Sequence, residues 1–436
     1  MLDGNNRFEF VTDGDAGAIG DFLDAIFVET GNGNDRVTFE VSDWESGLDV
    51  VSVNTGGGND RFTFEAENFD APLSNFNVDT GGGSDRVDIE ADSSQFGNTL
   101  SNQFVIETGQ DRDRVDLSFT NSTLRADQVG FETGGDRDQL GLELEDSRLT
   151  AGEFRVDTGD DSDRVDLTIE SQNAGDGLIG QIIRFETGAG DDRLGIDVEG
   201  AQLGDFGTDL LLVSTANGDD QIDIESADNG LVIGTTFNVN SGSGDDRIRM
   251  RAEGQHTGSD AVGFRAQEFS VESGSGEDRI ELTSAIETDV QIGGFESEEF
   301  LVSAGNDDDR IRLTADNEDG AGFLVFGDID IEGDGGDDRI EVISKSTYGV
   351  VWVGELEVKG DGGDDRITLS GDESGSFFSY DALFVLAGDG DDRVSVSERE
   401  EQAFAIPGET VLDGGNGEDR LDNDLDNADI VDFEDV

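Results

Sequence analysis

The residues of this chain best suited to chemistry form a glycine-rich acidic turn, as in Gly414-Gly415-Asn416-Gly417-Glu418-Asp419. Closely spaced glycines allow backbone conformations with positive φ, so carbonyl oxygens can converge on one point instead of pairing in a sheet. The Asp that ends the turn adds a carboxylate. Hard cations take about six to eight oxygen ligands, and calcium tolerates irregular geometry better than magnesium does. The turn therefore has the groups needed to bind calcium.

The same turn recurs along the whole chain, and we call the residue that follows it the marker. Sixteen markers occur at spacings of 25 to 32 residues, with a mean of about 27. The residue before the marker is Asp in every copy after the first, which has Asn6. Such a period is typical of stacked repeat proteins, in which each unit buries its apolar face against its neighbours. The markers are Arg7, Arg36, Arg61, Arg86, Arg114, Gln139, Arg164, Arg193, Gln221, Arg247, Arg279, Arg310, Arg339, Arg366, Arg393 and Arg420.

Short alternating segments flank each turn. Residues 61–65 after one turn and 76–80 before the next alternate polar and apolar side chains, which predicts half-buried strands, and helical spacing is absent. Because every repeat has the same order of strands, like strands must stack in parallel and in register. We therefore predict an all-β fold, a parallel β-solenoid of the β-roll or β-helix kind with about 16 coils, in which apolar runs in the return segments add a third, less regular strand. Residues 1–436 are expected to form a single domain, with 424–436 as an acidic C-terminal tail or assembly strand.

The composition is strongly acidic, with 104 Asp and Glu against 27 Lys and Arg and a formal net charge of −77. Such a charge opposes compaction and argues against nucleic acid or an anionic membrane as a partner. It points instead to cations that the sequence does not supply, or to the general surface acidity of a halophile. The absence of Cys excludes disulfides and thiolate metal sites. No apolar run approaches the roughly 18 residues of a membrane span, and the start lacks a signal-peptide pattern.

The Asp before each marker is the predicted calcium ligand. Stacked turns lie about 4.8 Å apart, which places each Asp near the carbonyl oxygens of the next turn. We expect sites between coils, and up to about 15 calcium ions in all. Four turns that have Asp111, Asp136, Asp161 and Asp307 in place of a glycine are expected to bind least well. The predicted ligands are Asp35, Asp60, Asp85, Asp113, Asp138, Asp163, Asp192, Asp220, Asp246, Asp278, Asp309, Asp338, Asp365, Asp392 and Asp419.

Residues 414–422 resemble the RTX (haemolysin-type) calcium-binding repeat, Gly-Gly-x-Gly-x-Asp-x-apolar-x, at every position. The other turns resemble it with one or two departures, so the resemblance covers essentially residues 3–422. It implies calcium ions between the turns of a parallel β-roll, and a protein that leaves the cell by type I secretion and folds where calcium is abundant. RTX repeats usually follow one another directly, whereas here a long return segment follows each turn. Only one edge of the solenoid is therefore expected to carry ions.

Two further columns accompany the acidic one. The Arg markers are interpreted as a ladder with neighbouring carboxylates, and the alternative is an anion-binding stripe. The residue that opens the turn is Thr in eight copies, which we interpret as a hydrogen-bonded ladder; an ice-binding face is the alternative. These residues are Thr30, Thr55, Thr80, Thr108, Thr133, Thr158, Thr187 and Thr215.

The sequence favours an extracellular or cell-surface calcium-binding structural protein that folds on binding calcium. The first turn, from Asp3, lacks a preceding strand, and residues 428–434 resemble a pre-turn strand with no turn to follow. These complementary half-coils predict head-to-tail assembly with other copies into surface or matrix filaments. The alternatives are a monomeric rod, a calcium-dependent adhesin fragment that binds a cell surface or polysaccharide, and a β-helix enzyme that acts on polysaccharide. We expect no enzyme, because the notable groups recur in every coil whereas an active site needs residues that occur once.

Overall fold

The computed structural model divides into two compact units, Met1–Thr215 and Ala216–Val436, each built from stacked coils. The residues it describes form strands, bridges and turns, and no helix occurs among them. They are residues 4–12, 23–44, 48–97, 102–171, 173, 176–200, 206–227, 234–255, 263–287, 292–317, 321–345, 349–371, 377–379, 381–398, 404–405, 408–423, 429–431 and 433.

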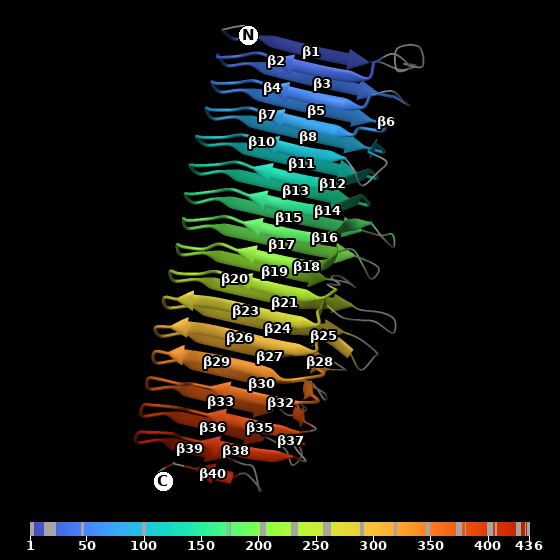
Figure 1. Cartoon of the computed structure of the whole chain (residues 1–436). Helices are drawn as coiled ribbons and strands as arrows, with labels where there is room; N and C mark the ends of the chain where they lie inside the picture. Colours follow the sequence, from blue (N-terminus) through green and yellow to red (C-terminus); the bar gives the residue numbers. More distant parts are fainter. Residues whose placement is uncertain are drawn as a thin grey trace. The chain divides into compact units, whose positions relative to one another are not determined.

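A strand begins at every marker, and these post-turn strands form one parallel sheet face in each unit (Figure 1). Pairing is in register, so that Arg61 lies opposite Arg86 and Phe62 opposite Val87. In unit 1 the strands are β1 (Arg7–Thr12), β3 (Arg36–Ser42), β5 (Arg61–Glu67), β8 (Arg86–Asp92), β11 (Arg114–Thr120), β13 (Gln139–Glu145), β15 (Arg164–Ser171) and β17 (Arg193–Gly200). In unit 2 they are β19 (Gln221–Ala227), β21 (Arg247–Gln255), β24 (Arg279–Glu287), β27 (Arg310–Ala315), β30 (Arg339–Ser344), β33 (Arg366–Gly371), β36 (Arg393–Glu398) and β39 (Arg420–Asn423).

The pre-turn strands form the second parallel face. In unit 1 they are β2 (Ala25–Glu29), β4 (Val50–Asn54), β7 (Asn75–Asp79), β10 (Gln103–Glu107), β12 (Thr123–Glu132), β14 (Arg148–Asp157), β16 (Gly177–Glu186) and β18 (Phe206–Ser214), with the short β6 (Asp70–Ala71) and β9 (Gln95–Phe96) beside them. In unit 2 they are β20 (Thr236–Asn240), β23 (Glu268–Ser275), β26 (Glu299–Asn306), β29 (Ile329–Gly335), β32 (Glu355–Lys359), β35 (Ala382–Leu386), β38 (Glu409–Asp413) and β40 (Asp429–Val431). β40 pairs in parallel with β38 and occupies the place where the sequence predicted a strand.

The return segments add a third face in unit 2, as the apolar runs predicted. Its strands are β22 (Phe264–Arg265), β25 (Ile292–Ser297), β28 (Ala321–Val325), β31 (Val350–Trp352), β34 (Phe377–Ser379) and β37 (Phe404–Ala405). In unit 1 the return and pre-turn segments instead merge into single ten-residue strands, as in β12, β14 and β16.

Inward-facing apolar side chains fill each coil. In unit 1, Phe64 and Phe76 pack edge to face with ring centroids 5.4 Å apart. In unit 2, phenylalanines of successive coils stack almost parallel: Phe269 lies 4.6 Å from Phe237, and Phe295 lies 4.7 Å from Phe264. These distances match the spacing of neighbouring strands, so each ring packs on the ring of the next coil.

The structure confirms an all-β parallel β-solenoid with a period near 27 residues. The single-domain expectation for 1–436 stays a prediction. Of the predicted tail or assembly strand, residues 424–428, 432 and 434–436 lie outside the described residues.

Candidate cation-binding turns

The turns share one backbone path that requires positive φ at two positions. In the turn before Arg86 these are Gly81 (φ 87°) and Gly83 (φ 117°). A Cβ added to Gly81 would lie 1.8 Å from the carbonyl oxygen of Gly56 in the preceding coil, so a side chain at Gly81 would have to displace that carbonyl. Where Asp replaces the second of these glycines it adopts the same left-handed conformation and the turn keeps its path. The replacements are Asp111 (φ 77°), Asp136 (φ 73°), Asp161 (φ 78°) and Asp307 (φ 83°).

The Asp before each marker, from Asp35 to Asp419, is at most 3% exposed, and these residues are called the buried Asp column. Within each unit, Oδ1 of each carboxylate after the first accepts the backbone N–H of the Asp one coil earlier. For example, Asp60 N–H donates to Asp85 Oδ1 at 2.7 Å, and Asp338 N–H donates to Asp365 Oδ1 at 2.7 Å. The structure therefore brings the predicted ligands together within each unit, and it uses one oxygen of each to join neighbouring coils.

The second carboxylate oxygen, Oδ2, is buried without a hydrogen-bond donor along most of the column. Buried polar atoms almost always have a partner, and a buried charge is normally paired or coordinates a metal. A column of such atoms therefore indicates that a positive charge is needed there. The Oδ2 atoms concerned belong to Asp35, Asp60, Asp85, Asp113, Asp138, Asp163, Asp246, Asp278, Asp309, Asp338, Asp365, Asp392 and Asp419.

Burial raises the pKa of several of these carboxyl groups above the usual Asp value. In unit 1 burial raises the pKa of Asp85 to about 7 and that of Asp113 to about 8. The backbone N–H bond and a nearby Thr hydroxyl lower the pKa of Asp113 somewhat, and the Asp85 charge raises it further. In unit 2 burial raises the pKa of Asp338 to about 7 and that of Asp365 to about 8. Near neutral pH the carboxylates therefore require either protons or another cation.

The Thr residues that open the turns form the expected ladder. Thr30 Oγ1 donates to the Thr55 carbonyl at 3.0 Å, and Thr80 Oγ1 donates to the Thr108 carbonyl at 3.5 Å. Both Thr55 and Thr80 are fully buried. Because these hydroxyls lie inside the turns, they cannot form a surface array, and the ice-binding alternative is wrong for this column.

The donor set fits a hard cation that binds both carboxylate and backbone oxygen. Among the described residues, no three or more Asp, Glu, His or Cys side chains converge in a metal-binding cluster. Each coil directs one Asp into the turn edge, so a cation there would depend on the Oδ2 atoms together with turn carbonyls. Calcium accepts such mixed oxygen ligands.

A second acidic column lies beside the first in unit 2, and we call it the exposed acid column. It consists of the residue before each buried Asp, and its members are held by the backbone: Asp364 N–H donates to Asp337 Oδ1 at 2.8 Å, and Asp391 N–H donates to Asp364 Oδ1 at 2.8 Å. Sequence reasoning missed this column, although an acid at this position in every turn from Asp219 onward was visible. Its members are Asp219, Asp245, Glu277, Asp308, Asp337, Asp364, Asp391 and Glu418.

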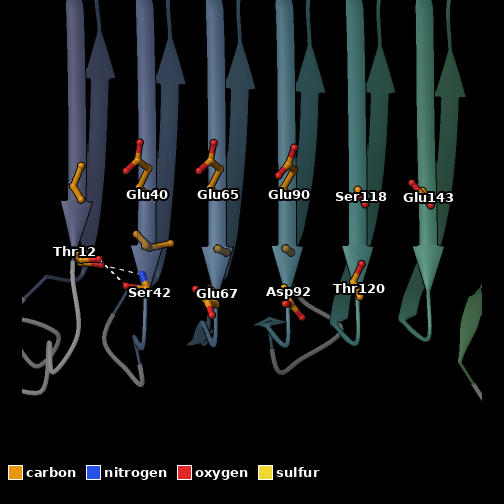
Figure 2. A pocket seen from close by; sticks show the side chains of 14 residues that line it. Thr12, Glu40, Ser42, Glu65, Glu67, Glu90, Asp92, Ser118, Thr120 and Glu143 are labelled. Carbon is orange, nitrogen blue, oxygen red and sulfur yellow. Dashed lines mark hydrogen bonds between the residues drawn. The ribbon is translucent and has the colours of Figure 1, made fainter.

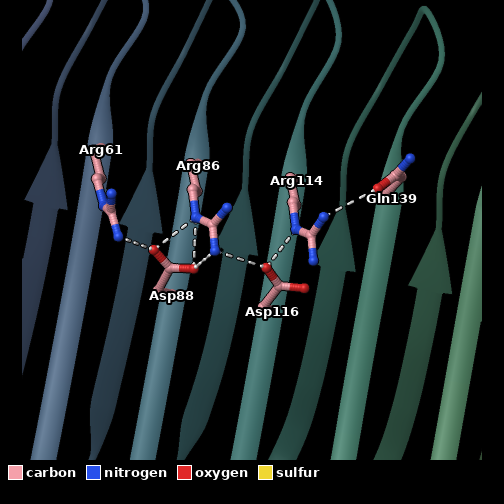
Figure 3. Close-up of polar contacts among 6 residues, drawn as sticks. All are labelled: Arg61, Arg86, Asp88, Arg114, Asp116 and Gln139. Atoms are coloured by element: carbon pink, nitrogen blue, oxygen red, sulfur yellow. Dashed lines mark hydrogen bonds and ion pairs between the residues drawn. The ribbon is translucent and has the colours of Figure 1, made fainter.

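The Arg markers form a ladder on the outer face of the post-turn strands (Figure 3). Arg86 contacts Asp88 at 2.7 Å and Asp116 at 3.3 Å, and Arg61 contacts Asp88 at 2.9 Å. The partners are thus acids two residues after a marker, whereas the Asp immediately before each marker is buried in the turn. These guanidinium groups are engaged by carboxylates, which supports the ladder over an anion-binding stripe.

Figure 2 shows a shallow groove on the same face of unit 1, lined by outward-facing acids of successive strands. Glu40, Glu65 and Glu90 lie opposite one another in register. Partial desolvation and the charges of Glu40 and Glu90 raise the pKa of Glu65. The row repeats one side chain per coil and does not converge on a point, so it lacks the geometry of a catalytic centre.

Comparisons with protein-family models, with curated proteins and with solved structures gave no match. The described part of the chain contains no helix long and apolar enough to cross a membrane. The repeat and its turn geometry are therefore the basis for assigning a function.

Proposed function

We propose that this chain is a calcium-binding structural repeat protein similar to the RTX family, whose fold depends on cations held along the turn edge. The observation that carries the proposal is the buried Asp column with Oδ2 atoms that lack a donor. A divalent cation would supply the missing positive charge and keep these carboxylates ionised. Removing one partner from a buried charge is costly, so the metal-free chain should be strongly destabilised at neutral pH.

Cation binding of this kind is coupled to folding. The unfolded chain does not hold the buried Asp residues in a column, so binding free energy becomes folding free energy. About 15 divalent ions would neutralise roughly 30 of the 77 excess negative charges. Neutralisation on this scale relieves the self-repulsion that otherwise favours an expanded chain.

Export and assembly belong to the same proposal. We infer an extracellular or cell-surface protein that leaves by type I secretion and folds when it meets calcium. Among the described strands β1 pairs only with β3, and Phe8 and Phe10 are half-buried where the matching Val37 and Phe39 are fully buried. In unit 2, Ile430 of β40 is 54% exposed. A second copy of the chain that stacks head to tail would cover these surfaces and build a filament.

Two alternatives use the same column. A monomeric rod, or an adhesin fragment that binds a cell surface or polysaccharide, would also depend on calcium for its fold. A polysaccharide-active enzyme is disfavoured because the acids and arginines described above recur from coil to coil.

Far-ultraviolet circular dichroism of the whole chain at pH 8 tests the proposal. We expect a β-sheet spectrum in millimolar calcium, a largely unfolded spectrum in chelator, and weaker recovery in magnesium, which demands more regular geometry. Ionic strength is held constant so that general screening does not differ between samples. An unchanged β-sheet spectrum in chelator at low salt would contradict calcium-dependent folding and favour the halophile explanation.

A further inference from the structure

The outer face of the post-turn strands carries a different balance of charge in the two units. Residues two apart in a strand point to the same side, so the marker and the second and fourth residues after it face outward together. In unit 1, part of which Figure 3 shows, the seven post-turn strands from β3 to β17 hold six Arg and eight Asp or Glu at these positions. In unit 2, the six post-turn strands from β21 to β36 hold nine Arg and two Glu there, and we call this surface the basic face. Its arginines are Arg247, Arg249, Arg251, Arg279, Arg310, Arg312, Arg339, Arg366 and Arg393.

The two carboxylates of the basic face, Glu281 and Glu341, are each shared by several guanidinium groups. These carboxylates are too few for the donors around them, because Nε of Arg279, Arg310 and Arg312 is buried without an acceptor. The ion pairs are those of Glu281 with Arg247 at 3.5 Å and with Arg279, and those of Glu341 with Arg310 at 3.0 Å, with Arg312 at 3.9 Å and with Arg339.

Three arginines of the basic face, Arg249, Arg366 and Arg393, form no ion pair with a carboxylate of the described residues, those of the exposed acid column included. Arg366 and Arg393 are exposed to solvent. The other outward positions of β33 and β36 carry hydroxyl groups and no charge, so no neighbouring side chain at those positions neutralises the two arginines. The hydroxyl-bearing residues are Thr368, Ser370, Ser395 and Ser397.

The marker arginines form a column across the basic face, with one arginine in each coil. They pair in register, as Arg247 with Arg279 and Arg366 with Arg393. Neighbouring strands lie about 4.8 Å apart, so the column runs for about 24 Å. A guanidinium group binds an oxyanion through two parallel N–H bonds. Because the screening length is about 8 Å at physiological ionic strength, the charge of this face outweighs that of distant parts of the chain at contact.

The side chains beside the column indicate the kind of anionic ligand. Hydroxyl groups both donate and accept hydrogen bonds, as the hydroxyls of a sugar do. No aromatic side chain occupies the outward positions of the basic face, so the bases of a single-stranded nucleic acid would have nothing to stack on. A polysaccharide with sulfate or carboxylate groups on its sugars presents both repeated oxyanions and hydroxyls.

We propose that the basic face of unit 2 binds an acidic polysaccharide, whose sulfate or carboxylate groups pair with the column of marker arginines. Arg366 and Arg393 offer guanidinium groups that no carboxylate of the protein engages, and the Ser and Thr side chains beside them bind the sugar hydroxyls. The inference adds a ligand and a site to the structural protein proposed above, and it does not depend on calcium in the turns.

Titration calorimetry of the whole protein in constant millimolar calcium tests the proposal, with dextran sulfate, carboxymethyl dextran and neutral dextran of equal length as probes. We expect binding of at least one charged dextran and none of neutral dextran. Combining Arg366→Gln with Arg393→Gln should weaken that binding by at least about tenfold, because charge-assisted hydrogen bonds are lost. Neither arginine has a carboxylate partner to leave unpaired, so the melting temperature in calcium should not change.

The matched control combines Arg36→Gln with Arg193→Gln in unit 1. These two markers are also exposed and also form no ion pair among the described residues, so the control removes the same charge from the same column position. It should change the affinity for charged dextran by less than about twofold, because distant charges are screened.

The other outcomes decide against the proposal or separate it from the calcium function. Equal weakening by both pairs of substitutions, no binding of either charged dextran, or equal binding of neutral dextran would overturn it. Self-association of the wild type in sedimentation velocity that only the unit 2 pair abolishes would assign the basic face to a second copy of the chain and would also overturn it. A protein that stays folded in chelator, and loses charged dextran only through the unit 2 pair, would contradict calcium-dependent folding and support this inference.

Discussion

Metal-free protein should lose stability as the pH rises, and the buried Asp column sets both the sign and the size of this effect. Burial raises the pKa of Asp113 from the ordinary Asp value of about 4 to about 8. Between these values the folded state binds a proton that the unfolded state has released, so stability is fully present below about pH 4 and is lost as the pH rises through about 8. Between the two pKa values, each such group lowers the free energy of unfolding by about 1.4 kcal/mol per pH unit.

The total effect is large compared with protein stability. Over about four pH units one such Asp lowers the free energy of unfolding by on the order of 5 kcal/mol. The whole free energy of unfolding of a typical domain is only about 5–15 kcal/mol. Several members of the column have similarly raised pKa values, among them Asp163 and Asp309, both at about 8. Chelated protein is therefore expected to be folded near pH 5 and unfolded near pH 9, and calcium should restore the fold at pH 9.

Thermal unfolding followed by circular dichroism, measured at half-unit steps of pH in chelator and 1 M salt, provides the assay. The high salt shortens the screening length to about 3 Å and suppresses general repulsion among surface charges. Asp113→Asn should reduce the slope by about 1.4 kcal/mol per pH unit. The exposed Asp127→Asn serves as the control and should leave the slope nearly unchanged. Metal-free protein that is more stable at pH 9 than at pH 5 would refute the reasoning.

Four further outcomes are expected. Gly81→Ala should lower the free energy of unfolding in denaturant titrations by more than about 2 kcal/mol, because φ is positive and a Cβ would meet the Gly56 carbonyl. The control Gly82→Ala has open space around its Cβ and should change the free energy of unfolding by less than about 0.5 kcal/mol. Phe295→Ala should cost about 3–5 kcal/mol through a cavity in the ring stack, and a smaller loss would show that the stack closes around it. Arg86→Gln should cost less than about 1 kcal/mol, because its ion pairs are exposed. Deleting residues 424–436 should abolish calcium-dependent filaments in sedimentation velocity, whereas full-length protein that sediments as a monomer in millimolar calcium would contradict head-to-tail assembly.

Much of the fold could be predicted from the sequence because each coil repeats the same local pattern. The alternation after Arg61 and Arg86 fixes which side chains face inward, and a constant order of segments fixes parallel, in-register pairing. The third face of unit 2 could be predicted only as a less regular strand, since runs such as Val350–Trp352 are short and irregular. The merging of return and pre-turn segments in β12 could not be foreseen, because it depends on how the backbone closes each coil.

The candidate site was predicted in its residues but not in its contacts. The recurrence of Asp before the marker identified the buried Asp column. No sequence pattern showed that Oδ1 of Asp85 would accept the Asp60 N–H while Oδ2 stayed without a hydrogen-bond donor. The Arg ladder was expected from the spacing of Arg86 and its equivalents. Its partners, such as Asp88, follow from strand geometry, in which residues two apart lie on the same face.

In-register stacking also has an evolutionary consequence. Because Arg61 lies opposite Arg86 and equivalent positions within each unit repeat this relation, duplication of one whole repeat in the gene would insert a coil whose pairing partners are already present above and below it. The number of coils can therefore grow or shrink by recombination without a new core having to evolve. Differences among the copies, such as Thr in some and Ala or Gly in others at the turn opening, can then accumulate in one stretch of coils without disturbing the pairing of its neighbours.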